Sequence, residues 1–438
     1  MNLSGRPPNG AALYKPGMFE SLRIRDFRYL WFANVAGTFA MQMQMVARGW
    51  LIYDMTKSPL ALTWVMLSFM LPSFVFSLLG GVIADRMHKR PIMIGSQVVN
   101  TLATIALGLF IITGEVTFWH FIWFGVFNGT VLSISMPARS AVIPDLVPRA
   151  SLVNAMALQS ATFNLSRIVG PALAGGLIAI FASFDASSFV GVGVVFFVIA
   201  ALYLASMIST VQMDYVGAPE ARAPSTVRAD IAEVFRYMRT EQLILGLLIM
   251  GFVPFTFGFA AQSLLPAFNH DVIHGGPDDL GLLMTAMGVG ALLGSLILAR
   301  IGDVGRKGRL MFVTAYLWAI SIAAFALTTT EWSAMLFGAF TGLFGAVFGS
   351  VNMSIVQLAV RQEIRGRVMS LNMMSMGLMP LGVIPISAAA EYVGIEVGLL
   401  ISAVLLAASM VWLGRVFPNL KSIDKGHGVT SPASHASP

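Results

Sequence analysis

The 438-residue sequence contains no cysteine. Disulfide bonds, zinc or iron–sulfur sites with cysteine ligands, and catalytic thiols are therefore excluded. Charged side chains are also scarce, since Asp, Glu, Lys and Arg make up 11% of the sequence, whereas soluble domains have about 25%. Together with an apolar fraction of 57%, this composition excludes a water-soluble globular protein.

Motifs for catalysis and for nucleotide binding are absent as well. There is no HExxH zinc motif and no Walker loop for phosphate. We therefore expect no metal site, no cofactor, no enzymatic activity and no direct use of ATP. A receptor or scaffold is disfavoured because no extramembrane domain is present that could signal. The histidines fall in predicted loops, at the edges of apolar segments or in the C-terminal tail: His88, His120, His270, His274, His427 and His435.

What the sequence has instead is a series of apolar runs of about 20 residues, the length of a helix that crosses a bilayer. The fold class predicted from them is an all-α polytopic membrane protein with twelve transmembrane helices. Six spans are expected near residues 27–53, 59–84, 91–113, 117–139, 151–181 and 187–210. Six more are expected near residues 242–268, 279–300, 308–330, 333–360, 367–391 and 396–417.

The positive charges give the expected orientation of these spans. Both termini are predicted to be cytoplasmic, because cations then gather on the inner side and only Lys57 stays outside. The expected location is the plasma membrane, the inner membrane of a bacterium. Topology and anionic lipid explain the net charge of +6, so no nucleic-acid partner is expected. The inner cations are Arg23, Arg25, Arg28, Arg86, Lys89, Arg90, Arg149, Arg236, Arg306, Lys307, Arg309, Arg365 and Arg367.

The spans divide into two groups of six that repeat each other. Leu79-Gly80 and Leu293-Gly294 both precede a basic loop, at an offset of 214 residues (293 − 79). This repeat predicts a duplicated six-helix unit with a binding site between the halves at mid-membrane depth. The expected domains are an N-terminal segment at 1–26, a bundle at 27–210, a cytoplasmic linker with a short amphipathic helix at 211–241, a second bundle at 242–417 and a disordered tail at 418–438.

The loop after the second span carries a recognisable motif. It reads Gly80-Gly81-Val82-Ile83-Ala84-Asp85-Arg86-Met87-His88-Lys89-Arg90-Pro91. This resembles the signature loop of the major facilitator superfamily, although His88 stands where that family usually has glycine or a small residue. We expect Asp85 to hold an inner gate with Arg139 and the start of span eleven, because all lie at the cytoplasmic ends of their spans. The predicted gate residues are Gly81, Asp85, Arg86, Lys89, Arg90, Arg139, Arg365 and Arg367.

Span five carries a second motif, Gly170-Pro171-Ala172-Leu173-Ala174-Gly175-Gly176. It looks like the Gly-Pro motif of antiporters in the same superfamily, with Ala174 where a glycine is usual. Small residues that serve only close helix packing are the alternative interpretation. The segments 50–59 and 137–148 resemble the drug:proton antiporter branch that contains enterobactin exporters and macrolide efflux proteins. The resemblance covers residues 20–417 and implies two six-helix bundles with alternating access.

Two arginines, Arg48 and Arg167, lie well inside predicted spans, where each costs about 2.5 to 3.5 kcal/mol unless it faces a cavity or a partner. Arg48 can face the cavity or reach outward to Asp54. For Arg167 a cavity or a buried hydrogen-bond network is expected, with Asn128, Gln159 or Gln262 as acceptors. The residues predicted to line a substrate cavity are Asn34, Thr38, Gln42, Arg48, Asn128, Arg167 and Gln262.

The predicted function is a secondary active transporter, a proton-coupled exporter of small amphipathic molecules such as a drug, siderophore or secondary metabolite. An importer or exchanger of a specific metabolite or lipid is the alternative. No Asp or Glu lies in the middle of a predicted span, so Asp54 and Asp85, near span ends, are the candidates for proton coupling, or the proton is carried by the substrate. The expected partners are a small-molecule substrate, protons and membrane lipids, and we expect a monomer.

Overall fold

The computed structural model describes residues 19–185, 188–215, 242–302, 305–360, 368–369 and 377–421. Within these ranges every regular element is a helix, which confirms the all-α fold class. The first half contains η1 Glu20–Arg23, α1 Arg25–Thr56, α2 Pro59–Arg86, α3 Lys89–Ile112, α4 Phe118–Leu146, η2 Arg149–Ser151, α5 Leu152–Asp185 and α6 Ser188–Val211. The second half contains α8 Gln242–Ser263, α9 Leu265–Phe268, η3 Asn269–Ile273, α10 Pro277–Ile301, α11 Lys307–Ala326, α12 Glu331–Ala359, α14 Met379–Val393, α15 Ile395–Val416 and η4 Pro418–Leu420.

These helices coincide with the apolar runs of the sequence. In the described part of the chain, 10 helical segments are long and apolar enough to cross a membrane. The 32-residue α1 corresponds to the first predicted span. The 15-residue α14 corresponds to the described part of the span predicted at 367–391. The linker helix predicted within 211–241 lies outside the described residues, as do Arg365 and Arg367.

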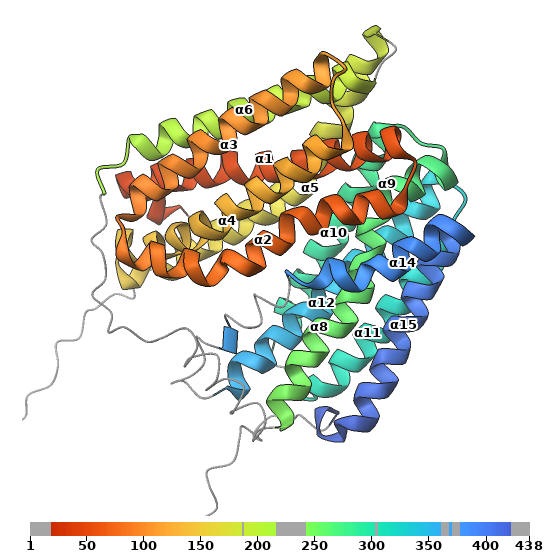
Figure 1. The fold of residues 1–438 in the computed structure, drawn as a ribbon. Helices are drawn as coiled ribbons and strands as arrows, with labels where there is room; N and C mark the ends of the chain where they lie inside the picture. Colours follow the sequence, from red (N-terminus) through yellow and green to blue (C-terminus); the bar gives the residue numbers. More distant parts are fainter. Residues whose placement is uncertain are drawn as a thin grey trace, which may run out of the picture.

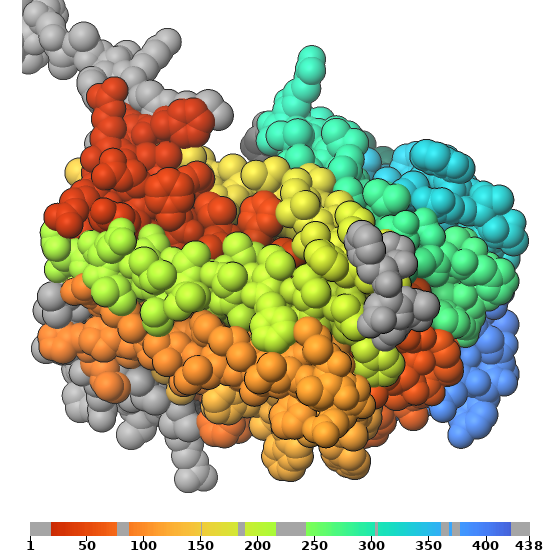
Figure 2. Space-filling view, turned by 90° about the horizontal axis from the view of Figure 1, so that it is seen from above, coloured from red at the N-terminus to blue at the C-terminus, as the bar shows by residue number. Residues whose placement is uncertain are grey.

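The helices form two bundles, α1–α6 and α8–α15 (Figure 1). The bundles meet through α5 with α10, α2 with α14, and α1 with α9 and α10. From that end they diverge, so that α8 and α15 run away from the first bundle (Figure 1). Seen from above, the yellow residues of α5 lie beside the green to cyan residues of the second bundle (Figure 2). We call the end with α9 and α14 the closed end and the opposite end the diverging end.

The fourth helix differs from its prediction. The sequence predicts that this span ends at Arg139, but α4 continues through Pro144 to Leu146. Arg139 therefore lies inside the helix, where its Nη1 donates a hydrogen bond to Asn34 Oδ1 of α1 at 3.0 Å. An acceptor on the neighbouring helix removes the need for this cation to reach the membrane surface. The expectation that Arg139 marks the end of its span is thus wrong.

The second bundle extends beyond its predicted end at 417. Leu420 of η4 is fully buried. Its backbone oxygen lies so close to Gly308 of α11 that a Cβ there would be 2.1 Å away, and its side chain approaches Gly246 of α8. Residues 418–421 are therefore packed against the bundle and do not belong to the predicted tail.

Glycines hold equivalent helix pairs together in the two halves. A Cβ at Gly129 of α4 would lie 2.0 Å from the carbonyl oxygen of Phe69 in α2, and one at Gly342 of α12 would lie 2.0 Å from the carbonyl oxygen of Met287 in α10. The two glycines are 213 residues apart (342 − 129), close to the 214-residue offset of the sequence repeat. Backbones in membrane helices approach this closely only where no side chain intervenes. The same contact at the repeat offset indicates that the halves are copies of one six-helix unit.

These contacts predict a stability effect. Gly342→Ala is expected to lower the thermal unfolding temperature of the purified protein in detergent, because overpacking a close helix contact costs about 1 to 3 kcal/mol. Gly95→Ala on α3 is the matched control, since a Cβ at Gly95 would meet nothing within 4 Å. Tryptophan fluorescence during heating gives the measurement. Equal unfolding temperatures for the two variants would show that the α10–α12 contact is not tight.

Candidate functional site

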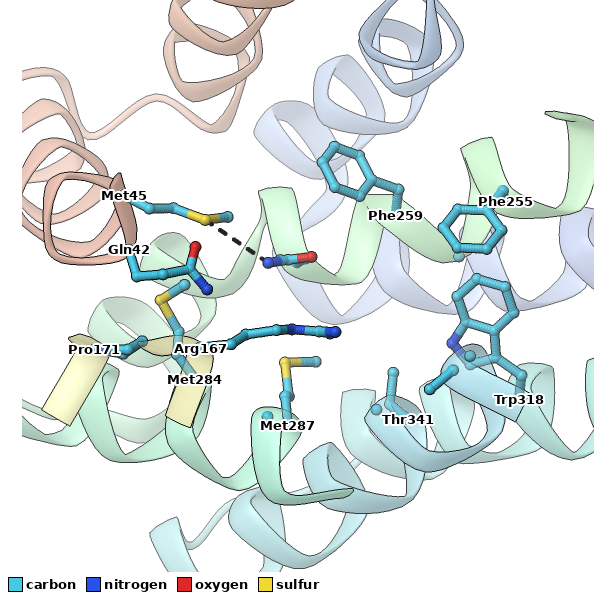
Figure 3. Close-up of a pocket in the computed structure, with 16 residues that line it drawn as sticks. Gln42, Met45, Arg167, Pro171, Phe255, Phe259, Met284, Met287, Trp318 and Thr341 are labelled. Atoms are coloured by element: carbon cyan, nitrogen blue, oxygen red, sulfur yellow. Dashed lines mark hydrogen bonds between the residues drawn. The ribbon is translucent and has the colours of Figure 1, made fainter. Parts of the chain in front are cut away.

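A cavity of about 210 Å³ lies between the two bundles. Its walls combine residues of α1 and α5 from the first half with residues of α8, α10, α11 and α12 from the second half (Figure 3). The cavity is therefore where the sequence repeat predicts a binding site. Its lining residues are Gln42, Met45, Arg167, Pro171, Phe255, Gly258, Phe259, Gln262, Met284, Met287, Gly288, Trp318, Thr341, Gly342, Gly345 and Ala346.

The polar groups of the cavity come from both halves. Arg167 of α5 extends across the cavity toward the wall that carries Trp318 (Figure 3). Gln42 of α1 lies on the same side, and Gln262 of α8 donates a long contact of 3.8 Å from Nε2 to the sulfur of Met45. One charged group and two amides thus face a space otherwise bounded by methionine, aromatic and small residues.

Aromatic side chains form the opposite wall. The rings of Phe255 and Trp318 meet edge to face, with centroids 5.4 Å apart, and Phe348 supports Trp318 at 5.9 Å. Trp318 is buried, and its Nε1–H has no hydrogen-bond partner among the residues described. Gly345 of α12 lies directly beside this nitrogen. The wall therefore offers a large apolar surface to the cavity.

The structure brings together only part of the predicted cavity set. Gln42, Arg167 and Gln262 line the cavity, whereas Asn34, Thr38, Arg48 and Asn128 do not. The predicted partners Asn128 and Gln159 are likewise not among the lining residues near Arg167.

The four other residues have their recorded contacts within the first bundle. Asn34 accepts from Arg139, and Thr38 donates to the backbone oxygen of Asn34 at 2.8 Å. Asn128 donates to Asn100 of α3 at 3.2 Å. The Arg48 guanidinium lies 5.6 Å from the ring centroid of Phe69, a cation–π contact. In the described structure these four side chains contact groups of the first bundle and do not line this cavity, so their part in substrate binding stays a prediction.

The antiporter-like motif lies at the interface of the halves. A Cβ at Gly170 would be 2.8 Å from the Cβ of Gln42, and one at Gly175 would be 2.4 Å from the carbonyl oxygen of Pro277 in α10. Gly176, in contrast, has nothing within 4 Å. Because Pro171 has no N–H, it leaves the backbone carbonyl of Arg167 without its usual helical donor, and this carbonyl lies against Gly288 of α10. The motif thus shapes the α5–α10 contact next to the cavity.

A polar network joins the halves at the closed end. The Tyr53 hydroxyl donates to Asp271 of η3. The Lys57 ammonium donates to Asp54 at 2.9 Å and contacts His270 Nε2 at 2.8 Å, while His270 Nδ1 lies 2.7 Å from Asp271 Oδ1. Asp54, a predicted coupling residue, is part of this network through its contact with Lys57.

A second set of contacts joins α2 to α14 at the same end. Ser58 donates to Glu391 at 2.6 Å, and the Leu60 backbone N–H donates to the same carboxylate at 3.2 Å. The hydroxyls of Thr63 and Ser387, both fully buried, lie 2.6 Å apart. Sequence reasoning missed His270, Asp271 and Glu391 as interface groups, because their partners are more than 200 residues away along the chain.

At the diverging end, Lys89 and Arg90 contact groups of the first bundle or of the segment that follows it. The ammonium of Lys89, which is 3% exposed, contacts Asp145 at 2.9 Å, and Asp145 also accepts from the Tyr215 hydroxyl. Arg90 donates to the backbone oxygen of Val211. The side chains of Gly81, Asp85 and Arg86 lie outside the described part of the chain, so the predicted gate at Asp85 stays a prediction.

A family profile described as "Transmembrane secretion effector" matches residues 17–433. The chain belongs to this family of major facilitator transporters. The transporter is 23% identical over 402 residues to macrolide efflux protein A of Streptococcus pyogenes, with 91% of this chain and 96% of that protein covered. It is 23% identical over 371 residues to the staphyloferrin A transporter of Staphylococcus aureus, covering 82% and 89%. It is 25% identical over 298 residues to the enterobactin exporter of Citrobacter koseri, covering 68% and 69%.

Solved structures of other transporters share the fold. A nucleoside transporter matches with a TM-score of 0.65 at 13% identity, covering 91% of this chain and 99% of the other. A D-xylose–proton symporter matches with a TM-score of 0.66 at 12% identity, covering 93% and 100%. The predicted superfamily and its two-bundle fold are therefore confirmed, and the protein is a membrane transporter rather than an enzyme.

Proposed function

We propose that the transporter is a secondary active exporter of small amphipathic molecules, coupled to protons and working by alternating access. The observation that carries the proposal is the central cavity, which lies between two repeated bundles and joins an arginine and two amides to aromatic and methionine side chains. Such a site suits molecules with one polar and one apolar part. Relatives named as a macrolide efflux protein and an enterobactin exporter favour export.

The proposal includes an orientation. We take the closed end, with Lys57 as its one cation among the loops of the first bundle, as the outer end, and the diverging end with Lys89 and Arg90 as the inner end. With this orientation, the arrangement of the two bundles corresponds to a state that is closed to the outside. A molecule from the inner side would bind between the bundles before the closed end opens.

The closed-end network supports the proton coupling. A lysine ammonium can only donate hydrogen bonds, so the contact of Lys57 requires a lone pair on His270 Nε2. His270 is then neutral, and its Nδ1–H donates to Asp271. A proton added at Nε2 would remove the lone pair that accepts from Lys57. It would also place a second positive charge beside the Lys57 ammonium. Protonation from the outside would therefore weaken the contact that holds the halves together.

Other charged groups surround this histidine. Asp54 and the Tyr53 hydroxyl face the network from α1, Glu391 lies nearby on α14, and α15, which packs against η3, begins with Glu396 in its first turn. The network therefore gathers titratable groups near the ends of the spans, where the sequence places its acidic residues. Asp54, the sequence candidate for coupling, belongs to this network.

The function is tested by flux of a compound panel into inverted membrane vesicles. The voltage is held at zero with potassium and valinomycin, and a pH gradient is imposed or omitted. We expect uphill accumulation of amphipathic compounds only when the vesicle interior, which corresponds to the cell exterior, is acidic. Uphill transport that follows sodium, or that persists without a proton gradient, would refute the proton coupling.

The histidine can be tested separately. His270→Gln keeps an acceptor for Lys57 and a donor for Asp271 but cannot take up a proton at neutral pH. We expect the several-fold stimulation of export by an acidic exterior to fall to almost none, because the contact no longer responds to pH. His274→Asn is the control, since His274 lies in the same loop, is exposed and has a positive φ of 58° that asparagine tolerates. An unchanged pH response in His270→Gln would exclude this residue as the coupling site.

A further inference from the structure

The central cavity has an electrostatic imbalance. Arg167 extends into it, and none of the lining residues in the described part of the chain is acidic. The sequence also has no Asp or Glu in the middle of any predicted span. The positive charge of Arg167 therefore faces the cavity without a carboxylate to balance it.

The other intramembrane arginines do not share this situation. Arg48 lies over the ring of Phe69, and Arg139 donates to Asn34, so each has a partner within the first bundle. Arg167 is placed instead where α5 borders the cavity, next to Pro171 and opposite the second bundle (Figure 3). An arginine at this depth is costly unless it faces water or an anion, which suggests that its charge is kept for a ligand.

The groups around Arg167 are suited to an acidic group. The guanidinium offers a planar fork of N–H donors that matches a carboxylate with two parallel hydrogen bonds. Gln42 and Gln262 add amide donors to the same cavity. In a cavity bounded by apolar side chains, these donors act on an anion more strongly than they would in water.

The remaining wall residues determine which kind of molecule can carry the acidic group. Phe255, Phe259 and Trp318 form an aromatic surface, and Met284 and Met287 line the side of the cavity near Arg167 with flexible thioethers (Figure 3). Aromatic rings and methionine bind apolar or aromatic bodies of varied shape. A small inorganic anion would leave this surface unused, so the chemistry favours an organic acid with a sizeable apolar part.

We propose that the substrate is an amphipathic organic anion whose acidic group binds Arg167 and whose apolar body lies against Phe255, Phe259 and Trp318. This inference rests on the proposed export function and narrows its substrate class. It assigns Arg167 the role of selecting charge and the aromatic wall the role of accepting varied shapes.

The test uses three fluorescent probes that share one dansyl body: dansylglycine with a carboxylate, dansylglycinamide with a neutral amide, and dansylcadaverine with an ammonium group. Binding to the purified transporter is measured by fluorescence anisotropy. Reconstitution in phosphatidylcholine nanodiscs keeps anionic lipid headgroups away from Arg167. We expect the carboxylate probe to bind at least tenfold more tightly than the amide and more tightly still than the ammonium probe.

Variants connect the preference to its residue. In Arg167→Gln the tenfold preference for the carboxylate should vanish while binding of the amide probe stays within about twofold, and Arg167→Lys should restore part of it, because a lysine keeps the charge but not the fork. Arg48→Gln is the control that removes an intramembrane arginine outside the cavity and should keep the preference. Size-exclusion profiles verify that each variant is folded.

Several results would overturn the inference. These are a wild-type transporter that binds the three probes equally, one that prefers the ammonium probe, one that does not bind the carboxylate probe, or a preference that survives in Arg167→Gln. Export of neutral or cationic compounds by the same preparation, with no carboxylate preference, would refute the anion site and leave the proposed export function intact. Absence of export for every class of compound would instead refute the proposed function.

Discussion

Gly175→Ala is expected to reduce transport by roughly 5- to 150-fold while the protein still inserts and folds. A Cβ at this position would lie 2.4 Å from the carbonyl oxygen of Pro277 and 3.1 Å from the Cα of Gly281. Both are backbone atoms of α10 or of the turn before it, so no side chain can rotate away. The closed end can accommodate the methyl group only if the two halves separate there.

The magnitude follows from the cost of overpacking. A penalty of about 1 to 3 kcal/mol on the closed-end contact shifts the equilibrium between the two halves' arrangements by roughly 5- to 150-fold. A carrier that must pass through both arrangements in each cycle slows when one of them becomes rare. Initial rates of export in vesicles, corrected for the amount of transporter, give the measurement.

Gly176→Ala provides a matched comparison. The neighbouring glycine belongs to the same sequence motif, but a Cβ there would meet nothing within 4 Å. We expect Gly176→Ala to export at close to the normal rate. Equal loss in both variants would mean that the motif acts through general helix flexibility and not through the α5–α10 contact.

Thr63→Cys combined with Ser387→Cys is expected to abolish transport under oxidising conditions. Their hydroxyl oxygens lie 2.6 Å apart across the α2–α14 contact, so two sulfur atoms in these places are within reach of a disulfide. A covalent bond there holds the closed end shut and prevents the halves from separating. Because the sequence has no cysteine, the new pair would be the only thiols in the protein.

Reversal by a reducing agent distinguishes locking from damage. We expect nearly complete loss of export after oxidation with copper phenanthroline and recovery after dithiothreitol. The two single variants are the controls and should be insensitive to both reagents. Full transport in the oxidised double variant, with the disulfide verified by mass spectrometry, would show that the α2–α14 contact does not open during the cycle.

The fold was predictable because a bilayer imposes its thickness on every span. Apolar runs of about 20 residues located the helices, and repeated short motifs indicated the duplication. The end of α4 was not predictable, because Arg139 reads as a helix boundary until its partner Asn34 is known. Whether a polar residue marks a membrane surface or a contact between helices depends on the neighbouring helix, which local sequence does not contain.

The residues of the candidate site were also predictable only in part, because their partners lie on other helices. Arg167 was identified because an arginine at mid-membrane depth has few alternatives to a cavity. Arg48 has a similar insertion cost, but the ring of Phe69 provides its partner. The contacts of Tyr53 with Asp271 and of Ser58 with Glu391 link residues separated by 218 and 333 positions. No periodicity or motif in a single sequence encodes such pairs, since each arises only when two bundles meet.

Arg167 also has a consequence for energetics that involves the membrane voltage. Moving one elementary charge across 100 mV corresponds to about 2.3 kcal/mol. If a singly charged anion leaves the cell in exchange for one entering proton, two charges cross per cycle, and an interior-negative potential of that size contributes about 4.6 kcal/mol. Export would then generate an electric current and would continue at equal pH on both sides for as long as the cell interior stays negative.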